Sequence, residues 1–250
     1  MERSLPPSIT SDPRAASLVA ALDHTGELTF ERIAIPGSDR IVDVIRPVDI
    51  ETLLDQSADD PEQNLPYWAE IWPSGIALAA AILREPHLIA GIPVLELGSG
   101  VGITAAIALE TGAMLTATDY APESIAMTRL TCRLHTGREP DTRRINWRAP
   151  DADLLQADGT RWPVILAADV LYEERDIEPV LDVFERMLEP DGLVWLAEPG
   201  RKPSRLAVER APERGWAVES TTCTADWPDP KDAGVIVNIH KFRRTATADD

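Results

Sequence analysis

A short apolar segment that runs directly into closely spaced glycines constrains the fold of this chain more than any other feature. Residues 94–102 read V-L-E-L-G-S-G-V-G and precede the helix-forming stretch I-T-A-A-I-A-L-E at 103–110. Gly98, Gly100 and Gly102 let the backbone turn tightly and approach a ligand that a Cβ atom would block. The segment therefore predicts a strand, a tight loop and a helix, which together form a ligand site in open α/β sheets.

The rest of the chain continues this alternation of strands and helices. Strands are predicted at 114–119, 145–147, 163–169, 193–197, 216–222 and 234–242, and helices at 75–85, 122–135, 176–188 and 203–213. The stretch 176–188 places apolar residues at helical spacing, which is typical of an amphipathic helix. Because apolar strands alternate with helices, we expect a mostly parallel sheet covered by helices on both faces.

The N-terminal region has a different pattern. Residues 28–48 contain two alternating segments around P-G-S-D, which predict a β-hairpin, and the polar residues 55–66 predict a connector. We expect a division into a flexible N-terminus (1–17), a hairpin extension (18–64), a main α/β domain (65–242) and a flexible tail (243–250).

Composition narrows the class of protein. The chain has 250 residues, 44% of them hydrophobic, and 24 Lys+Arg against 42 Asp+Glu give a net charge of −18. This charge disfavours nonspecific binding to nucleic acid or anionic lipid and suits a basic partner. No apolar run is long enough to cross a bilayer, and the start lacks a secretory signal, so we expect a cytoplasmic protein. Two cysteines and four scattered histidines predict no metal site.

Acidic residues accompany the glycine loop. Glu96 precedes the first glycine, and Asp119 ends the following strand, where an aspartate can accept both hydroxyls of a ribose. A dinucleotide fingerprint would need glycine at 103, where the chain has Ile103, and no lysine follows to make a phosphate-binding P-loop. A nicotinamide oxidoreductase is therefore disfavoured.

These motifs resemble a known family. Glu96, the G-x-G-x-G loop and Asp119 look like the first two motifs of class I S-adenosylmethionine-dependent methyltransferases, and P-D-G-L-V-W-L-A at 190–197 looks like their fifth strand. The resemblance implies a Rossmann-like seven-stranded, mostly parallel sheet with helices on both faces, here with the small N-terminal β-hairpin. It also implies S-adenosyl-L-methionine as the cofactor.

A narrower resemblance covers about residues 64–201. The strings L-P-Y-W-A-E-I-W-P-S-G at 65–75, D-V-L-Y at 169–172 and E-P-G-R at 198–201 are similar to the seven-β-strand protein-lysine methyltransferases, including those acting on the electron-transfer-flavoprotein β-subunit. The resemblance implies that a set of residues contacts the cofactor, namely Trp72, Glu96, Gly98, Ser99, Gly100, Gly102, Asp119, Tyr120, Trp147 and Ala168. It places Asp169 and Tyr172 at the methyl-acceptor site.

Each of these residues also has a purely structural interpretation. Trp68 and Trp72, four residues apart, could form one helix face packed into the core. Trp147 could be a buried aromatic at a strand end, Glu96 could bind loop amides, and Asp169 could cap a following turn.

The sequence therefore favours an enzyme that methylates a lysine side chain of a protein. Transfer of a methyl group needs chiefly an in-line orientation of the reactants, so we expect Asp169 to anchor the amine and Tyr172 and Trp72 to line the transfer channel. A small-molecule N-methyltransferase and a cofactor-binding scaffold without turnover remain alternatives, because the same cofactor motifs serve all three.

Overall fold

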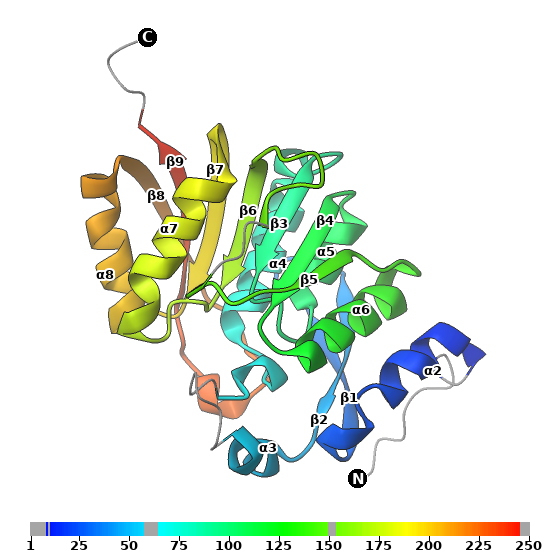
Figure 1. Cartoon of the computed structure of the whole chain (residues 1–250). Helices are drawn as coiled ribbons and strands as arrows, with labels where there is room; N and C mark the ends of the chain where they lie inside the picture. Colours follow the sequence, from blue (N-terminus) through cyan, green and yellow to red (C-terminus); the bar gives the residue numbers. More distant parts are fainter. Residues whose placement is uncertain (1–8, 10, 58–64, 150–153, 246–250) are drawn as a thin grey trace.

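A twisted seven-stranded sheet forms the centre of the described part of the computed structural model, which comprises residues 9, 11–57, 65–149 and 154–245 (Figure 1). Its strands are β3 (Pro93–Leu97), β4 (Met114–Asp119), β5 (Asp141–Arg144), β6 (Trp162–Ala168), β7 (Leu188–Glu198), β8 (Trp216–Cys223) and β9 (Val237–Arg244). The spatial order is β5-β4-β3-β6-β7-β9-β8, and β9 runs antiparallel to β7 and β8, the strands on either side of it. The predicted mostly parallel α/β sheet is confirmed.

Helices cover both faces of this sheet (Figure 1). The helices are α2 (Pro13–Ala20), α3 (Ile50–Ser57), α4 (Pro73–Arg84), α5 (Ile103–Glu110), α6 (Pro122–Thr136), α7 (Ile177–Met187) and α8 (Lys202–Arg210). One hydrophobic core joins α4, α5 and α6 to the sheet, and a second joins α7 and α8 to the opposite face. The helix α5 is apolar on all sides, which fits its position between α4, α6 and the sheet, where nearly all of it is buried.

The predicted N-terminal hairpin is present. Strands β1 (Leu28–Ala34) and β2 (Ile41–Pro47) pair antiparallel, with Ala34 opposite Ile41 at the turn. Ile33, Val42 and Val44 are fully buried in the same core as α5 and α6. The hairpin is therefore packed into the main domain instead of standing apart from it.

The N-terminal segment differs from its prediction. The expected flexible stretch 1–17 contains the first half of α2, whose first turn is capped when the Asp12 carboxylate accepts hydrogen bonds from the Arg14 and Ala15 N–H groups. Ala15 and Leu18 pack in a small core with Leu130 of α6. The helix is only eight residues long, so its sequence pattern covers little more than two turns.

One strand prediction is wrong. The fifth strand of the chain is not 145–147 but β5 at Asp141–Arg144, and Trp147 lies in the turn that follows. β5 is the edge strand of the sheet and is built from polar residues, so hydrophobicity could not reveal it.

The remaining boundaries differ in smaller ways. The predicted connector at 55–66 begins within α3, and its residues 58–64 lie outside the described part of the chain. The predicted tail at 243–250 begins within β9, and residues 246–250 are likewise outside the described residues.

We expect any side chain at Gly102, in the loop before α5, to lower the free energy of unfolding. This residue has φ of 84°, and an added Cβ would lie 2.7 Å from Thr128 Cα on α6. Gly137 at the end of α6 has φ of 72° with open space around it, so it is a matched control for backbone strain alone. Gly137→Ala should lower the free energy of unfolding by about 1 kcal/mol and Gly102→Ala by about 3 kcal/mol, because α5 and α6 must also separate. Urea denaturation would measure both, and equal losses would contradict this packing.

Candidate active site

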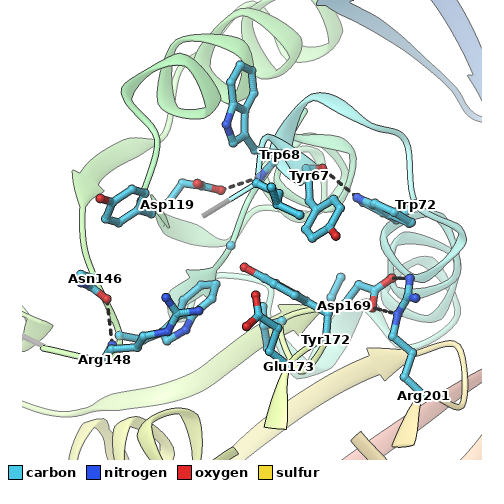
Figure 2. A pocket seen from close by; sticks show the side chains of 17 residues that line it. Tyr67, Trp68, Trp72, Asp119, Asn146, Arg148, Asp169, Tyr172, Glu173 and Arg201 are labelled. Atoms are coloured by element: carbon cyan, nitrogen blue, oxygen red, sulfur yellow. Dashed lines mark hydrogen bonds and ion pairs between the residues drawn. The ribbon is translucent and has the colours of Figure 1, made fainter. Parts of the chain in front are cut away.

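A cavity of about 400 Å³ opens at the carboxyl ends of β3, β4 and β6. Here the strand order reverses, because the chain moves from β3 to β4 on one side and later to β6 on the other, and such a switch point is where open α/β sheets bind ligands. The cavity is lined by Leu65, Tyr67, Trp68, Trp72, Gly98, Gly100, Asp119, Tyr120, Asn146, Trp147, Arg148, Ala168, Asp169, Val170, Tyr172, Glu173 and Arg201 (Figure 2).

The glycine loop forms the floor of this cavity. Gly98 and Gly100 have φ of 66° and 54°, and a Cβ on Gly98 would lie 2.9 Å from Val170 Cγ1. Ser99 and Gly102, expected to contact the cofactor, do not line the cavity. Ser99 Oγ instead accepts a hydrogen bond from Thr128 Oγ1 at 2.8 Å, and Gly102 is the N-cap residue immediately before α5. The loop thus divides into a floor and residues that brace it from below.

Asp119 lies at the end of β4 and faces the cavity. Its Oδ2 accepts a hydrogen bond from the Gly100 N–H at 3.0 Å, and its Oδ1 accepts one from the Ala121 N–H at 3.1 Å. Burial raises the pKa of this carboxyl, and the hydrogen bonds act in the opposite direction. Tyr120, the next residue, also lines the cavity, with the Arg144 guanidinium 5.3 Å from its ring centre.

Glu96 lies beneath the loop and does not line the cavity. It is 2% exposed, and among the described residues no group forms a hydrogen bond with its Oε2. Burial, followed by the nearby Asp119, raises the pKa of Glu96 to about 8. At neutral pH this side chain is therefore mostly a neutral carboxylic acid, and its Oε2 gives no support to the alternative that it binds loop amides.

Trp147 forms one wall of the cavity, next to Gly98. Its Nε1–H donates to Asp176 Oδ1 at 3.1 Å, and Arg148 Nε donates to the same oxygen at 2.6 Å. Asp176 is fully buried, so it fixes the indole ring in place. This orientation presents an aromatic surface to the cavity, which suits stacking on a purine.

Asp169 and Arg201 form an ion pair at the other end of the cavity (Figure 2). Asp169 follows β6 and is, among the described residues, the one non-glycine residue with positive φ (55°). Arg201 Nε and Nη2 donate to its two carboxylate oxygens at 3.1 and 3.3 Å. Burial raises the pKa of Asp169, and the Arg201 charge opposes that rise.

Three aromatic rings line the Asp169 end of the cavity. Tyr67 makes edge contacts with Tyr172 and Trp72, at ring-centre distances of 5.3 and 5.9 Å. Trp72 Nε1 donates to the Tyr67 carbonyl at 2.8 Å, and burial raises the pKa of Tyr172, so its phenol stays neutral. Trp68 lies in a short 3-10 turn and Trp72 immediately precedes α4, so the two do not form one helix face.

The structure therefore gathers most of the predicted residues in one cavity. Trp72, Gly98, Gly100, Asp119, Tyr120, Trp147, Ala168, Asp169 and Tyr172 all line it. The sequence did not single out Leu65, Asn146, Arg148, Val170 and Glu173, although each adjoins a predicted residue or motif. Within the described residues there is no group of three or more potential metal ligands, and no helix is long and apolar enough to cross a membrane.

A family model described as lysine methyltransferase matches residues 62–205, which carry this whole cavity. The chain belongs to the lysine methyltransferase family. Methyltransferases of this family use S-adenosylmethionine as the cofactor.

The chain is similar to curated proteins over part of their length. The electron transfer flavoprotein beta subunit lysine methyltransferase of Xenopus laevis is 31% identical over 138 residues, covering 54% of this chain and 53% of that protein. The histone-arginine methyltransferase METTL23 of Xenopus laevis is 26% identical over 164 residues, covering 64% of each. The chain thus spans about half the length of the flavoprotein-subunit methyltransferase.

Solved structures share the fold of this chain. A putative RNA methyltransferase from Pyrococcus horikoshii superposes with a TM-score of 0.55 and 16% identity, covering 78% of this chain and 98% of that one. The N-methyltransferase NodS from Bradyrhizobium japonicum, in complex with S-adenosyl-L-homocysteine, gives a TM-score of 0.54 and 16% identity over 79% of this chain and 98% of that one.

The buried Glu96 predicts a pH-dependent stability. Its pKa is raised on folding, so the folded state holds a proton that the unfolded state releases, and stability falls as pH rises from about 5 to 8. Glu96→Gln, which cannot ionise, should come close to the wild type at pH 5 and exceed its unfolding free energy by about 4 kcal/mol at pH 9. Urea titrations would measure this, with Glu209→Gln on the exposed face of α8 as the control. A Glu96→Gln effect that is the same at both pH values would contradict a raised pKa.

Proposed function

We propose that this protein transfers the methyl group of S-adenosylmethionine to the ε-amino group of a lysine on a protein substrate. One observation carries the proposal: a single cavity joins a nucleoside-type end, formed by Asp119 and Trp147, to an end with a carboxylate and aromatic rings, formed by Asp169, Trp72 and Tyr172. The family match and the names of the curated relatives support the choice of lysine.

The residues of the chain act mainly by binding and orientation. Asp119 has carboxylate lone pairs free to accept the hydroxyls of a ribose, and Trp147 offers its ring to an adenine. When bound, S-adenosylmethionine supplies a methyl group attached to a positively charged sulfur. This sulfur is the leaving group of the transfer. Fixing two reactants in line can contribute about 7–11 kcal/mol, so no further nucleophile is required.

A lysine must lose its positive charge at the acceptor end before its nitrogen can accept a methyl group. A lysine amine with its ordinary pKa near ~10.4 costs about 4 kcal/mol to deprotonate at neutral pH. Trp72, Tyr67 and Tyr172 give this end an aromatic lining, which would favour the neutral amine once the bound substrate covers it. Asp169 can then accept a hydrogen bond from the amine and point its lone pair along the cavity.

The substrate is, in this proposal, a protein with a basic surface around the lysine. The net charge of −18 would attract such a surface. The electron transfer flavoprotein β subunit, named for the relatives, is the first acceptor to test. We place the activity in the cytoplasm, which is compatible with Cys132 and Cys223 being free thiols.

The test is methyl transfer from labelled S-adenosylmethionine to purified flavoprotein β subunit and to proteins of a lysate, with the site located by mass spectrometry. We expect labelled lysine, a loss of at least about tenfold for Asp169→Asn, and an S-adenosylhomocysteine affinity that this variant leaves unchanged. Asp182→Asn, an exposed aspartate on α7, is the control and should keep full activity.

Other outcomes would contradict the proposal. A label found only on small molecules would establish the small-molecule N-methyltransferase alternative. A label on arginine would change the acceptor class, and cofactor binding with no labelled product would leave the scaffold alternative. Full transfer by Asp169→Asn would remove Asp169 from the acceptor site.

A further inference from the structure

Arg201 brings a positive charge to the acceptor end of the cavity. Its guanidinium lies between two groups assigned to the substrate amine, bonded to the Asp169 carboxylate and 5.3 Å from the centre of the Trp72 ring (Figure 2). Its side chain is 38% exposed, whereas that of Asp169 is 6% exposed. The buried carboxylate at this end is thus already neutralised by the protein itself.

The loop that carries Arg201 is held by a buried anchor. Glu198, at the end of β7, accepts hydrogen bonds from the Gly200 N–H, from the Ser204 hydroxyl and from Asn238 Nδ2. Burial acts to raise the pKa of Glu198, but hydrogen bonds from His240 and these groups lower it to about 2. The anchor therefore stays ionised, and the position of Arg201 does not depend on pH near neutrality.

Other charged groups also face this end. Asp232 and Tyr67 interact electrostatically with Arg201, and Glu198 and Asp232 interact electrostatically with Asp169. Lys231 lies 5.9 Å from the Trp72 ring centre and is paired with Glu70 and Asp229. Arg201 is in direct contact with the carboxylate of Asp169. These two charges therefore have the largest effect on whether the acceptor amine is protonated.

We propose that Arg201 is a positioning residue that keeps the acceptor lysine in its neutral, nucleophilic form by neutralising Asp169. This inference rests on the proposed function. An ionised Asp169 alone would favour the ammonium, whose nitrogen has no lone pair for attack. With Arg201 paired to it, Asp169 still offers lone pairs as a hydrogen-bond acceptor but no longer holds the proton on the amine.

The methyl-transfer step begins from the neutral amine. The lysine ammonium releases one proton to water before the reaction. The amine lone pair forms a bond to the methyl carbon while the bond from that carbon to sulfur breaks, and the electron pair stays on sulfur. The positive charge moves from sulfur to the methylated nitrogen, beside Asp169.

The pH dependence of kcat at saturating acceptor tests this role, because kcat reports ionisations in the enzyme–substrate complex. Arg201→Gln should lower kcat at pH 7 about tenfold and move the acidic limb of the profile up by about one pH unit, with recovery near pH 10. Arg201→Lys should restore most of the wild-type profile. Lys202→Gln, which removes an equal charge from the neighbouring exposed residue, should leave it unchanged.

A loop that is merely misplaced would behave differently. It would raise KM and weaken S-adenosylhomocysteine binding without moving the acidic limb, and this result for Arg201→Gln would overturn the inference. An acidic limb that moves down, or Arg201→Lys that behaves like Arg201→Gln, would also overturn it.

A binding measurement separates this inference from the proposed function. Sinefungin carries an amine-bearing carbon in place of the methylated sulfur, so its ammonium tests the charge at the acceptor end without turnover. By calorimetry at pH 7, the affinity for sinefungin relative to S-adenosylhomocysteine should rise about tenfold in Arg201→Gln and stay unchanged in Lys202→Gln. This result with no lysine transfer by the wild type would support the charge role and overturn the proposed acceptor. An unchanged ratio in Arg201→Gln would overturn the charge role.

Discussion

The hydrogen bond from the Gly100 N–H to the Asp119 carboxylate is the contact on which the site depends. It ties the loop after β3 to the end of β4, and it is possible because the loop adopts left-handed backbone that glycine accepts without strain. The helix α6 secures the same loop from below, where Ser124 Oγ donates to the Gly100 carbonyl and Gly102 contacts the backbone of Thr128. The floor of the cavity is therefore fixed by the core.

The two ends of the cavity differ in charge because different parts of the chain build them. The end with Asp119 and Trp147 is formed by β4, the turn after β5 and the buried Asp176. The other end joins the loop after β6 to the loop after β7, so that Asp169 meets Arg201 beside Trp72. In the proposed function, the net charge of −18 attracts a basic partner, and the ion pair keeps the acceptor end from holding a proton on the amine.

Much of the fold could be predicted from the sequence because it rests on local signals. The glycine loop, the apolar strands β3, β4 and β6 and the amphipathic helix α7 all appear as short-range patterns. The edge strand β5 and the short helix α2 escaped prediction because backbone pairing and a few tertiary contacts stabilise them. The ion pair between Asp169 and Arg201 joins residues 32 positions apart, and no local pattern indicates it. The motif residues Glu96, Ser99 and Gly102 support the loop from outside the cavity, a distinction that only geometry reveals.

A crystal structure of the protein with S-adenosylhomocysteine would test the central claim most directly. We expect the adenine against the Trp147 ring, the ribose hydroxyls within hydrogen-bond distance of Asp119, and the sulfur facing Asp169 and Trp72 along the cavity. The Asp169–Arg201 pair should remain intact beside it. A ligand bound elsewhere, or one whose adenine lies at the Asp169 end, would contradict the assignment of the two ends and the function drawn from it.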